Sequence, residues 1–164
     1  KLELEGLVLM IPRKGAIVAE ITVQDLEDVL EVRMALEELA VKIACKRITQ
    51  EQLEEIKRRS AEFCKTLYGD DVAACAQADM AFHDAIYEAT GNRRLVQILN
   101  NLREQMYRYR MEYLKDRQSH SLLVKEHEEI VQGLTERDAD RALRVTNSHI
   151  ERQRDYIIQQ LQHK

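Results

Sequence analysis

Residues 71–92, DVAACAQADMAFHDAIYEATGN, decide the fold of this chain. Apolar side chains recur at helical spacing through Val72, Cys75 and Phe82, and the stretch ends in a Gly-Asn pair that is typical of a helix C-terminus. This pattern predicts an amphipathic helix over residues 71–90. An amphipathic helix needs other apolar faces to pack against, so the remaining segments are expected to supply them.

Helical patterns continue on both sides of this stretch. Thr22, Thr49 and Asp138 each stand where an N-cap is expected, before an apolar-periodic segment. The predicted helices cover residues 23–47, 50–68, 71–90, 93–115, 121–134 and 139–161. The chain has only five Gly and one Pro, which favours long helices. Short linkers make consecutive helices antiparallel neighbours, so we expect an all-α antiparallel bundle of about six helices.

The first 21 residues differ from this helical region. Two β-prone runs, residues 6–11 and 16–19, flank a turn-like segment at 12–15, and this pattern predicts a β-hairpin. A lone two-stranded hairpin is marginally stable in water. We therefore interpret residues 1–21 as the end of a domain that begins upstream, and residues 22–164 as a separate helical domain.

Composition narrows the class of protein. Hydrophobic residues make up 45% of the chain and charged residues 33%, which supports a globular core. The net charge of −4 gives no general attraction to nucleic acid. Cys45, Cys64 and Cys75 form no CxxC pair, so we expect reduced, buried thiols in a cytoplasmic protein. No apolar run is long enough to cross a bilayer.

A carboxylate and three imidazoles form a candidate metal site. Asp79 and His83 lie four residues apart and so share one helix face. His127 and His149 each lie within an apolar stripe of a later predicted helix. Such a ligand set suits a divalent transition metal. The alternative is that each histidine is a hydrogen-bonded core residue, but burying all four groups without a common partner would be costly.

Arg33 occupies an apolar stripe of the first predicted helix, where a guanidinium needs an acidic partner. Two interpretations are open. Arg33 could pair with Glu37, one helical turn away. It could instead clamp the carboxylate of a small ligand through two parallel hydrogen bonds, next to a metal that holds another oxygen of the ligand.

A series of motifs is spaced along the helical region. They are Leu30-Glu31-Val32-Arg33 with Leu36-Glu37, Asp79-x-x-Phe82-His83, Thr90-Gly91-Asn92-x-x-Leu95, Glu126-His127 and His149. Together they resemble the C-terminal effector domain, or FCD domain, of the FadR subfamily of GntR transcription regulators. The resemblance covers residues 22–161 and fits the metal-containing branch of that subfamily.

The resemblance carries further expectations. It implies that Asp79, His83, His127 and His149 bind zinc, with nickel or manganese as alternatives, and that Arg33 contacts a small organic acid effector. It also implies a cytoplasmic homodimeric regulator and no enzyme. The fatty-acid regulator itself lacks this metal set, so acyl-CoA is a poor candidate for the effector.

The hairpin resembles the wing that ends a winged-helix DNA-binding domain in this family. The resemblance implies that Arg13 and Lys14, at the tip of the hairpin, contact operator DNA. The helices that would precede the wing are expected upstream of Lys1. An ordinary solvated turn is the alternative interpretation for these two residues.

Two other functions remain open. A metal-dependent hydrolase would share the ligands but would need a general base beside a metal-bound water. Glu126 and Glu128 flank His127 but are expected to face elsewhere, and no other inward-facing acid is clearly spare. A purely structural metal that stabilises the bundle without any effector is the third possibility.

Overall fold

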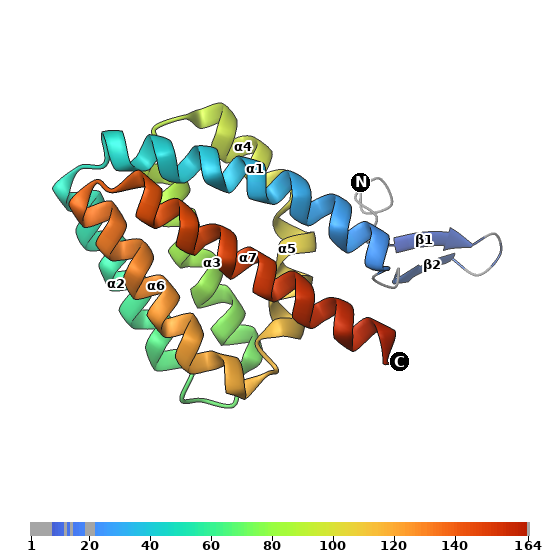
Figure 1. The fold of residues 1–164 in the computed structure, drawn as a ribbon. Helices are drawn as coiled ribbons and strands as arrows, with labels where there is room; N and C mark the ends of the chain where they lie inside the picture. The colour runs from blue at the N-terminus through green and yellow to red at the C-terminus, as the bar shows by residue number, and fades with distance from the viewer. Residues whose placement is uncertain (1–7, 12, 14, 19–21, 164) are drawn as a thin grey trace.

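The computed structural model describes residues 8–11, 13, 15–18 and 22–163. Within them the chain forms a two-stranded hairpin followed by seven α-helices and one short 3-10 helix (Figure 1). The elements are β1 (Val8–Ile11), β2 (Gly15–Val18), α1 (Val23–Arg47), α2 (Gln50–Thr66), α3 (Val72–Ala89), α4 (Arg93–Asn101), α5 (Arg103–Tyr113), the 3-10 helix (Arg117–Ser119), α6 (His120–Glu136) and α7 (Ala139–Gln162). The expected all-α bundle behind a short hairpin is confirmed.

Local capping sets several of the helix boundaries. The Thr22 side chain accepts a hydrogen bond from the backbone N–H of Asp25, so α1 begins at the predicted residue. At the start of α2, Thr49 and Gln52 form a complete capping box. Helix α3 is followed by Gly91, whose φ of +62° lies in the left-handed region that glycine adopts without strain.

One predicted helix is two helices in the structure. The expected helix over 93–115 breaks at Leu102, and the break separates α4 from α5. No glycine or proline marks this position, and the only local sign is the pair of weak helix formers Asn100 and Asn101 before it. The break accompanies a change of tertiary neighbour: α4 buries Leu95 and Leu99 against α1 and α3, whereas α5 packs on α3 and α7. A single straight helix would not direct both apolar faces to their different neighbours.

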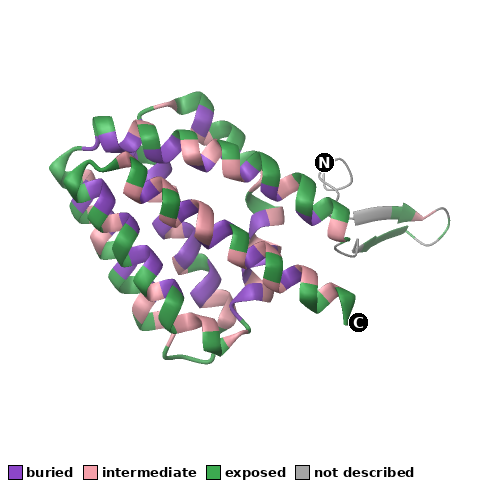
Figure 2. Ribbon diagram, in the orientation of Figure 1, coloured by how far each residue is buried: buried purple, intermediate pink, exposed green. Residues whose placement is uncertain are grey.

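Helices α3 and α7 organise the bundle. Helix α3 packs against α1, α2, α4 and α5, and α7 packs against α1, α5 and α6. Figure 2 shows that the buried residues lie along the faces where these helices meet. Most of them are apolar, but the interior also contains arginine, carboxylate and histidine side chains. Several of these polar side chains lie where α1, α3, α5, α6 and α7 approach one another.

The hairpin lies at the end of the molecule where α1 begins and α7 ends (Figure 1). Its strands are antiparallel, and Ile11 pairs with Gly15 across the turn. Arg13 within the turn has a φ of +68°. The predicted strand residues 6, 7 and 19, together with Lys14, lie outside the described residues.

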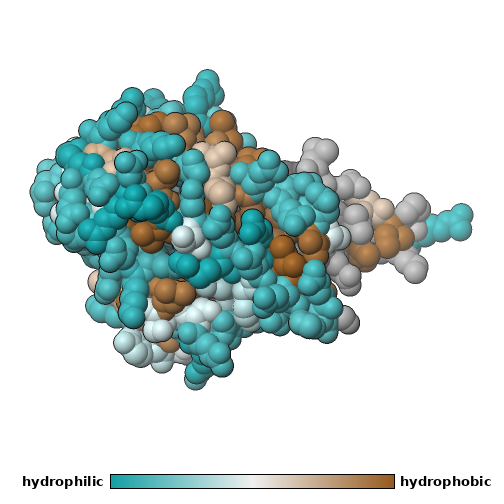
Figure 3. Space-filling view, viewed as in Figure 1, coloured by the Kyte–Doolittle hydropathy of each residue, from teal (hydrophilic) through white to brown (hydrophobic). Residues whose placement is uncertain are grey.

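The face seen in Figure 3 is largely hydrophilic and carries several apolar patches. Exposed large hydrophobic residues include Val32 and Leu39 on α1 and Ile98 on α4. Each helix in the described part of the chain falls short of the length and apolar character that a membrane span requires.

Candidate metal centre

Helix α3 supplies the first two side chains of the candidate site. Asp79 and His83 are one helical turn apart, so both project from the same face. Each is only 1% exposed. Phe82, on an adjacent part of the helix, is fully buried and anchors this face in the core with Ile86. The apolar residues of α3 thus hold a carboxylate and an imidazole inside the bundle.

The other two side chains come from the hairpin of α6 and α7. Arg137 adopts a left-handed conformation between the two helices, and the chain reverses there. A Cβ atom added at Gly133 would lie 2.8 Å from the Cβ atom of Ala142, so this glycine allows the two helices to approach closely. His127 on α6 and His149 on α7 are both fully buried, and their ring centroids lie 5.6 Å apart.

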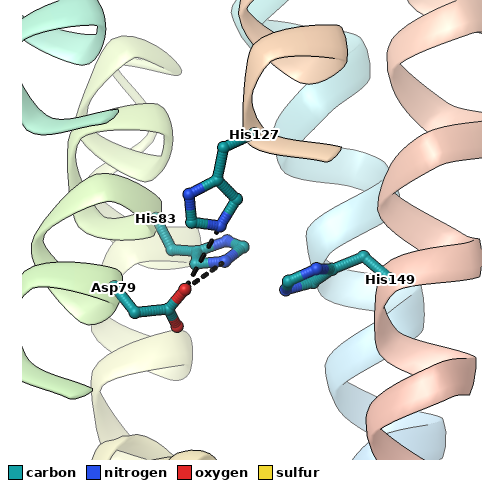
Figure 4. A group of neighbouring side chains, drawn as sticks. All are labelled: Asp79, His83, His127 and His149. Carbon is teal, nitrogen blue, oxygen red and sulfur yellow. Dashed lines mark ion pairs between the residues drawn. The ribbon is translucent and has the colours of Figure 1, made fainter. Parts of the chain in front are cut away.

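The four side chains converge on one point (Figure 4). One potential ligand atom from each of them lies within 4.8 Å of the corresponding atom of every other. Nε2 of His127 is 3.2 Å from Oδ1 of Asp79, and Nε2 of His83 is 3.9 Å from the same oxygen. The His149 ring approaches from the opposite side, so the four groups surround a common centre.

Two buried carboxylates orient two of the imidazoles. Nδ1 of His149 donates to Oε2 of Glu126 at 2.7 Å, and Nδ1 of His83 lies 3.3 Å from Oε2 of Glu37. Both contacts place the proton on Nδ1 and leave Nε2 with a lone pair. Nε2 of His83 has no hydrogen-bond partner among the described residues, and Nε2 of His149 accepts a hydrogen bond from Gln153 at 3.0 Å.

Aromatic packing, rather than a carboxylate, fixes the third imidazole. The His127 ring stacks on Phe82 with a centroid distance of 4.0 Å and an interplanar angle of 20°. Phe63 lies against it at 4.5 Å and 44°. Neither ring nitrogen of His127 has a hydrogen-bond partner among the described side chains. The ring is therefore held in position while its nitrogens remain available.

Two buried arginines complete the cluster. Nε of Arg110 on α5 lies 2.5 Å from Oδ2 of Asp79, the carboxylate of the candidate site. Nε of Arg33 on α1 donates to Oε1 of Glu37 at 2.6 Å, and the Tyr87 hydroxyl donates to the same oxygen at 2.8 Å. Arg33 is 0% exposed and Arg110 is 1% exposed, so these are buried charge pairs.

Comparison of the sequence with known protein families identifies the family of this chain. A family model described as the FCD domain matches residues 28–152, which is most of the chain. The chain belongs to the FCD domain family. The resemblance of the sequence motifs to the C-terminal FCD domain of GntR transcription regulators is thereby confirmed.

The relatives are distant in sequence but similar in fold. The uncharacterized HTH-type transcriptional regulator YdhC of Bacillus subtilis (strain 168) is 23% identical over 150 residues, which cover 90% of this chain and 66% of YdhC. The structure of E. coli McbR/YncC superposes with a TM-score of 0.86 at 16% identity, covering 97% of this chain and 80% of that one. The metal-free FCD domain of the regulator TM0439 superposes with a TM-score of 0.73 at 16% identity, covering 89% of this chain and all of that one. These structural similarities establish the shared fold.

The protonation states in this FCD domain suit metal binding. Burial lowers the pKa of His83 to about 4, against the opposing influence of Glu37. Burial and the neighbouring His127 lower the pKa of His149 to about 3. Burial raises the pKa of Asp79, but Arg110 and the neighbouring histidines outweigh it and hold that pKa well below its usual value. At neutral pH the site thus offers the ionised carboxylate of Asp79 and the neutral imidazoles of His83 and His149, the forms that bind metals.

The residues of the FCD domain therefore fit a divalent transition metal. Imidazole nitrogen and carboxylate oxygen are suitable donors for zinc, nickel or manganese. Buried polar atoms normally have partners, yet the ring nitrogens of His127 and Nε2 of His83 have no hydrogen bond in the described part of the chain. A bound cation would satisfy Nε2 of His83 and one ring nitrogen of His127. Four protein ligands would leave one or two positions for another oxygen on a five- or six-coordinate ion.

The first of the two roles considered for Arg33, the pair with Glu37, is seen in the structure. Nη1 of Arg33 also donates to Oε1 of Gln153 at 2.8 Å. Its Nη2, however, has no hydrogen-bond partner among the described residues. Of the two predicted DNA contacts, Arg13 is exposed, and Lys14 lies outside the described residues.

Several residues around the site were not predicted from sequence. Glu126 was expected to face away from the centre, and this was wrong: it is 3% exposed and binds His149, whereas Glu128 is exposed. Arg110 was not considered at all. A signal for it existed, because Arg110 shares a helical stripe with Tyr109 and Tyr113, and a cation in an apolar stripe needs a buried partner.

Replacing Glu126 with glutamine is expected to weaken metal binding by about 10- to 100-fold, the usual effect of losing a carboxylate behind a histidine ligand. The neutral amide would no longer stabilise the Nδ1–H of His149 as a carboxylate does. Competition with a chromophoric chelator measures the affinity. Glu128→Gln, on the exposed face of α6, is the matched control and should bind like wild type. Equal affinities for the two variants would show that Glu126 does not support the site.

Proposed function

We propose that this FCD domain binds one divalent metal through Asp79, His83, His127 and His149, and that a small carboxylate effector binds at the metal. Effector binding would modulate operator binding by a homodimeric GntR-type regulator. The observation that carries the proposal is the convergence of four buried potential ligands from three helices on one centre. We propose zinc as the first candidate and nickel or manganese as alternatives, because all accept nitrogen and oxygen donors.

Arg33 is the proposed contact for the effector. Its Nη1 donates to Gln153, which in turn donates to Nε2 of His149, so the guanidinium belongs to the same network as the metal ligands. Its unpartnered Nη2 is a free donor for a carboxylate. A bound metal would act as a Lewis acid and hold another oxygen of the same ligand. Cation and guanidinium together would recognise an organic acid.

DNA binding is assigned to a winged-helix domain that would precede the hairpin. YdhC is an HTH-type regulator, and this chain spans 66% of its length. Strands β1 and β2 have the antiparallel form expected of a wing, and Arg13 in the turn is exposed. We propose that two such heads in a cytoplasmic dimer contact two operator half-sites, with Arg13 and Lys14 close to the DNA backbone.

Helices α1 and α5 offer a route from the effector to the hairpin. Helix α1 carries Arg33 and is the first helix after the hairpin in the sequence. Helix α5 carries Arg110 beside Asp79, and the Tyr109 hydroxyl of the same helix donates to the backbone carbonyl of Asp25 in the first turn of α1 at 3.4 Å. An effector that favours one packing of α1 against α5 would therefore change the position of the hairpin. It can do so only if it binds that packing more tightly than the alternative.

Thermal denaturation with a panel of small carboxylates tests this function. Zinc-loaded protein should be stabilised by at least one acid, and chelation should abolish that stabilisation. Arg33→Lys keeps a positive charge beside Glu37 but lacks the planar fork, so it should lose most of the effect. Arg58→Lys, an exposed position on α2, is the matched control and should respond like wild type.

Three results would count against the proposal or change it. No stabilising acid would contradict an effector site, and an effect that persists after chelation would contradict a role for the metal. If zinc stabilises the protein but never changes its affinity for any acid, the metal is purely structural. A hydrolase is disfavoured because Glu37 and Glu126, the buried acids next to the ligands, are each engaged by a histidine and an arginine.

A further inference from the structure

Around the candidate metal centre, each negatively charged carboxylate is paired with one positively charged arginine. Three buried carboxylates each bind a different arginine, and the pairs are Glu37 with Arg33, Asp79 with Arg110 and Glu126 with Arg152. The three imidazoles bind a metal only in their neutral form. The protein groups around the candidate metal centre therefore sum to a charge of zero.

A divalent cation would disturb this balance. Because each carboxylate is already neutralised by an arginine, the ion would add two positive charges that no protein group offsets. Arg152 is partly exposed, with 41% of its side chain accessible, but Arg33 and Arg110 are buried. Uncompensated charge is costly in a buried site. A ligand that binds at the loaded site is thus favoured if it brings two negative charges.

Two guanidinium nitrogens are available to receive such a ligand. Nη2 of Arg33 on α1 and Nη2 of Arg110 on α5 are both buried and have no hydrogen-bond partner among the described residues. Both arginines lower the pKa of the Glu37 carboxyl, so both act on the same part of the interior. Because the two arginines come from separate helices, a ligand with two separated anionic groups can bind both of them, whereas a ligand with one anionic group can bind only one.

We infer that the effector is a small dicarboxylate. One carboxylate would bind the metal beside Arg33, and the second would accept hydrogen bonds from Arg110. This inference rests on the proposed function and narrows its effector from carboxylates in general to dianions. It also gives Arg110 a second role, in addition to its contact with Asp79.

Calorimetric titration of the zinc-loaded protein tests the inference. The ligands are dicarboxylates with three to six carbons, each compared with its own monoamide, which has nearly the same shape but one charge less. At the best chain length, the dicarboxylate should bind at least about tenfold more tightly than its monoamide. The reason is that a hydrogen bond between an arginine and a carboxylate contributes more than about 1.4 kcal/mol, which corresponds to a factor of ten in affinity. A ratio near one would overturn the inference while leaving the proposed function intact.

Variants of α5 test whether Arg110 binds the second carboxylate of the ligand. Arg110→Gln should bring the ratio close to one by weakening the dicarboxylate more than the monoamide. Arg110→Lys keeps the charge beside Asp79 but lacks the second nitrogen, so it should retain zinc and still lose most of the preference. Arg103→Gln, at an exposed position on α5 that pairs with Asp84, is the matched control and should keep the wild-type ratio.

The outcomes separate the two proposals. A wild-type ratio that persists in both Arg110 variants would overturn the role of Arg110. Binding of neither the dicarboxylates nor the monoamides to zinc-loaded wild-type protein would overturn the proposed function, and the dianion inference with it. Zinc content measured on each variant shows whether a lost preference reflects lost metal.

Discussion

His149→Ala is expected to weaken zinc binding by more than about 100-fold, which exceeds the usual effect of losing a supporting carboxylate behind a ligand. The substitution removes the only ligand from α7, the helix that approaches the centre opposite Asp79. It also leaves the Glu126 carboxylate without its histidine donor inside the protein.

Competition with a chromophoric chelator of known affinity measures this change directly. His163→Ala is the matched control, because His163 is exposed at the end of α7 and lies outside the cluster. That variant should bind zinc with wild-type affinity. If His149→Ala also stayed within about threefold of wild type, a shift below 1 kcal/mol, His149 would not be a ligand.

Zinc at about 1,000 times its dissociation constant is expected to stabilise the metal-free protein by about 4 kcal/mol. In a domain of this size that corresponds to a rise in melting temperature of about 8–16 °C, at 2–4 °C for each kcal/mol. The reason is that the four ligands come from α3, α6 and α7, which meet only in the folded state. The unfolded chain cannot present them together and so binds zinc weakly.

Circular dichroism melts of chelator-treated protein with and without added zinc measure the effect. His127→Ala should show almost no zinc-dependent shift, whereas its melting temperature without zinc reports the loss of packing against Phe63 and Phe82. A shift of equal size in wild type and in His127→Ala would mean that zinc stabilises the domain at some other place.

The sequence was most informative where local chemistry decides structure. Thr22 and the capping box of Thr49 and Gln52 set helix starts through hydrogen bonds a few residues long, so their positions could be predicted. The burial of His127 and His149 followed from the helical periodicity of the residues around them. Their convergence with Asp79 needed the assumption that α3 lies against the hairpin of α6 and α7, which the sequence alone does not establish.

The unpredicted features depend on contacts between distant segments. At the break at Leu102 the second neighbour changes, because α4 packs on α1 and α3 whereas α5 packs on α3 and α7, and no glycine or proline signals it. The contact between Glu126 and His149 joins adjacent helices across 23 residues of sequence. The contact of Arg110 with Asp79 joins α5 to α3. Helical periodicity places a side chain on a face but does not identify its partner on another helix.

Anomalous diffraction from crystals of the zinc-loaded domain, collected on both sides of the zinc absorption edge, tests the central claim most directly. The account predicts one strong peak within the bundle, at about 2.0–2.2 Å from a ring nitrogen of each of His83, His127 and His149 and from a carboxylate oxygen of Asp79. A zinc peak elsewhere on the domain, with no peak between these four side chains, would contradict it.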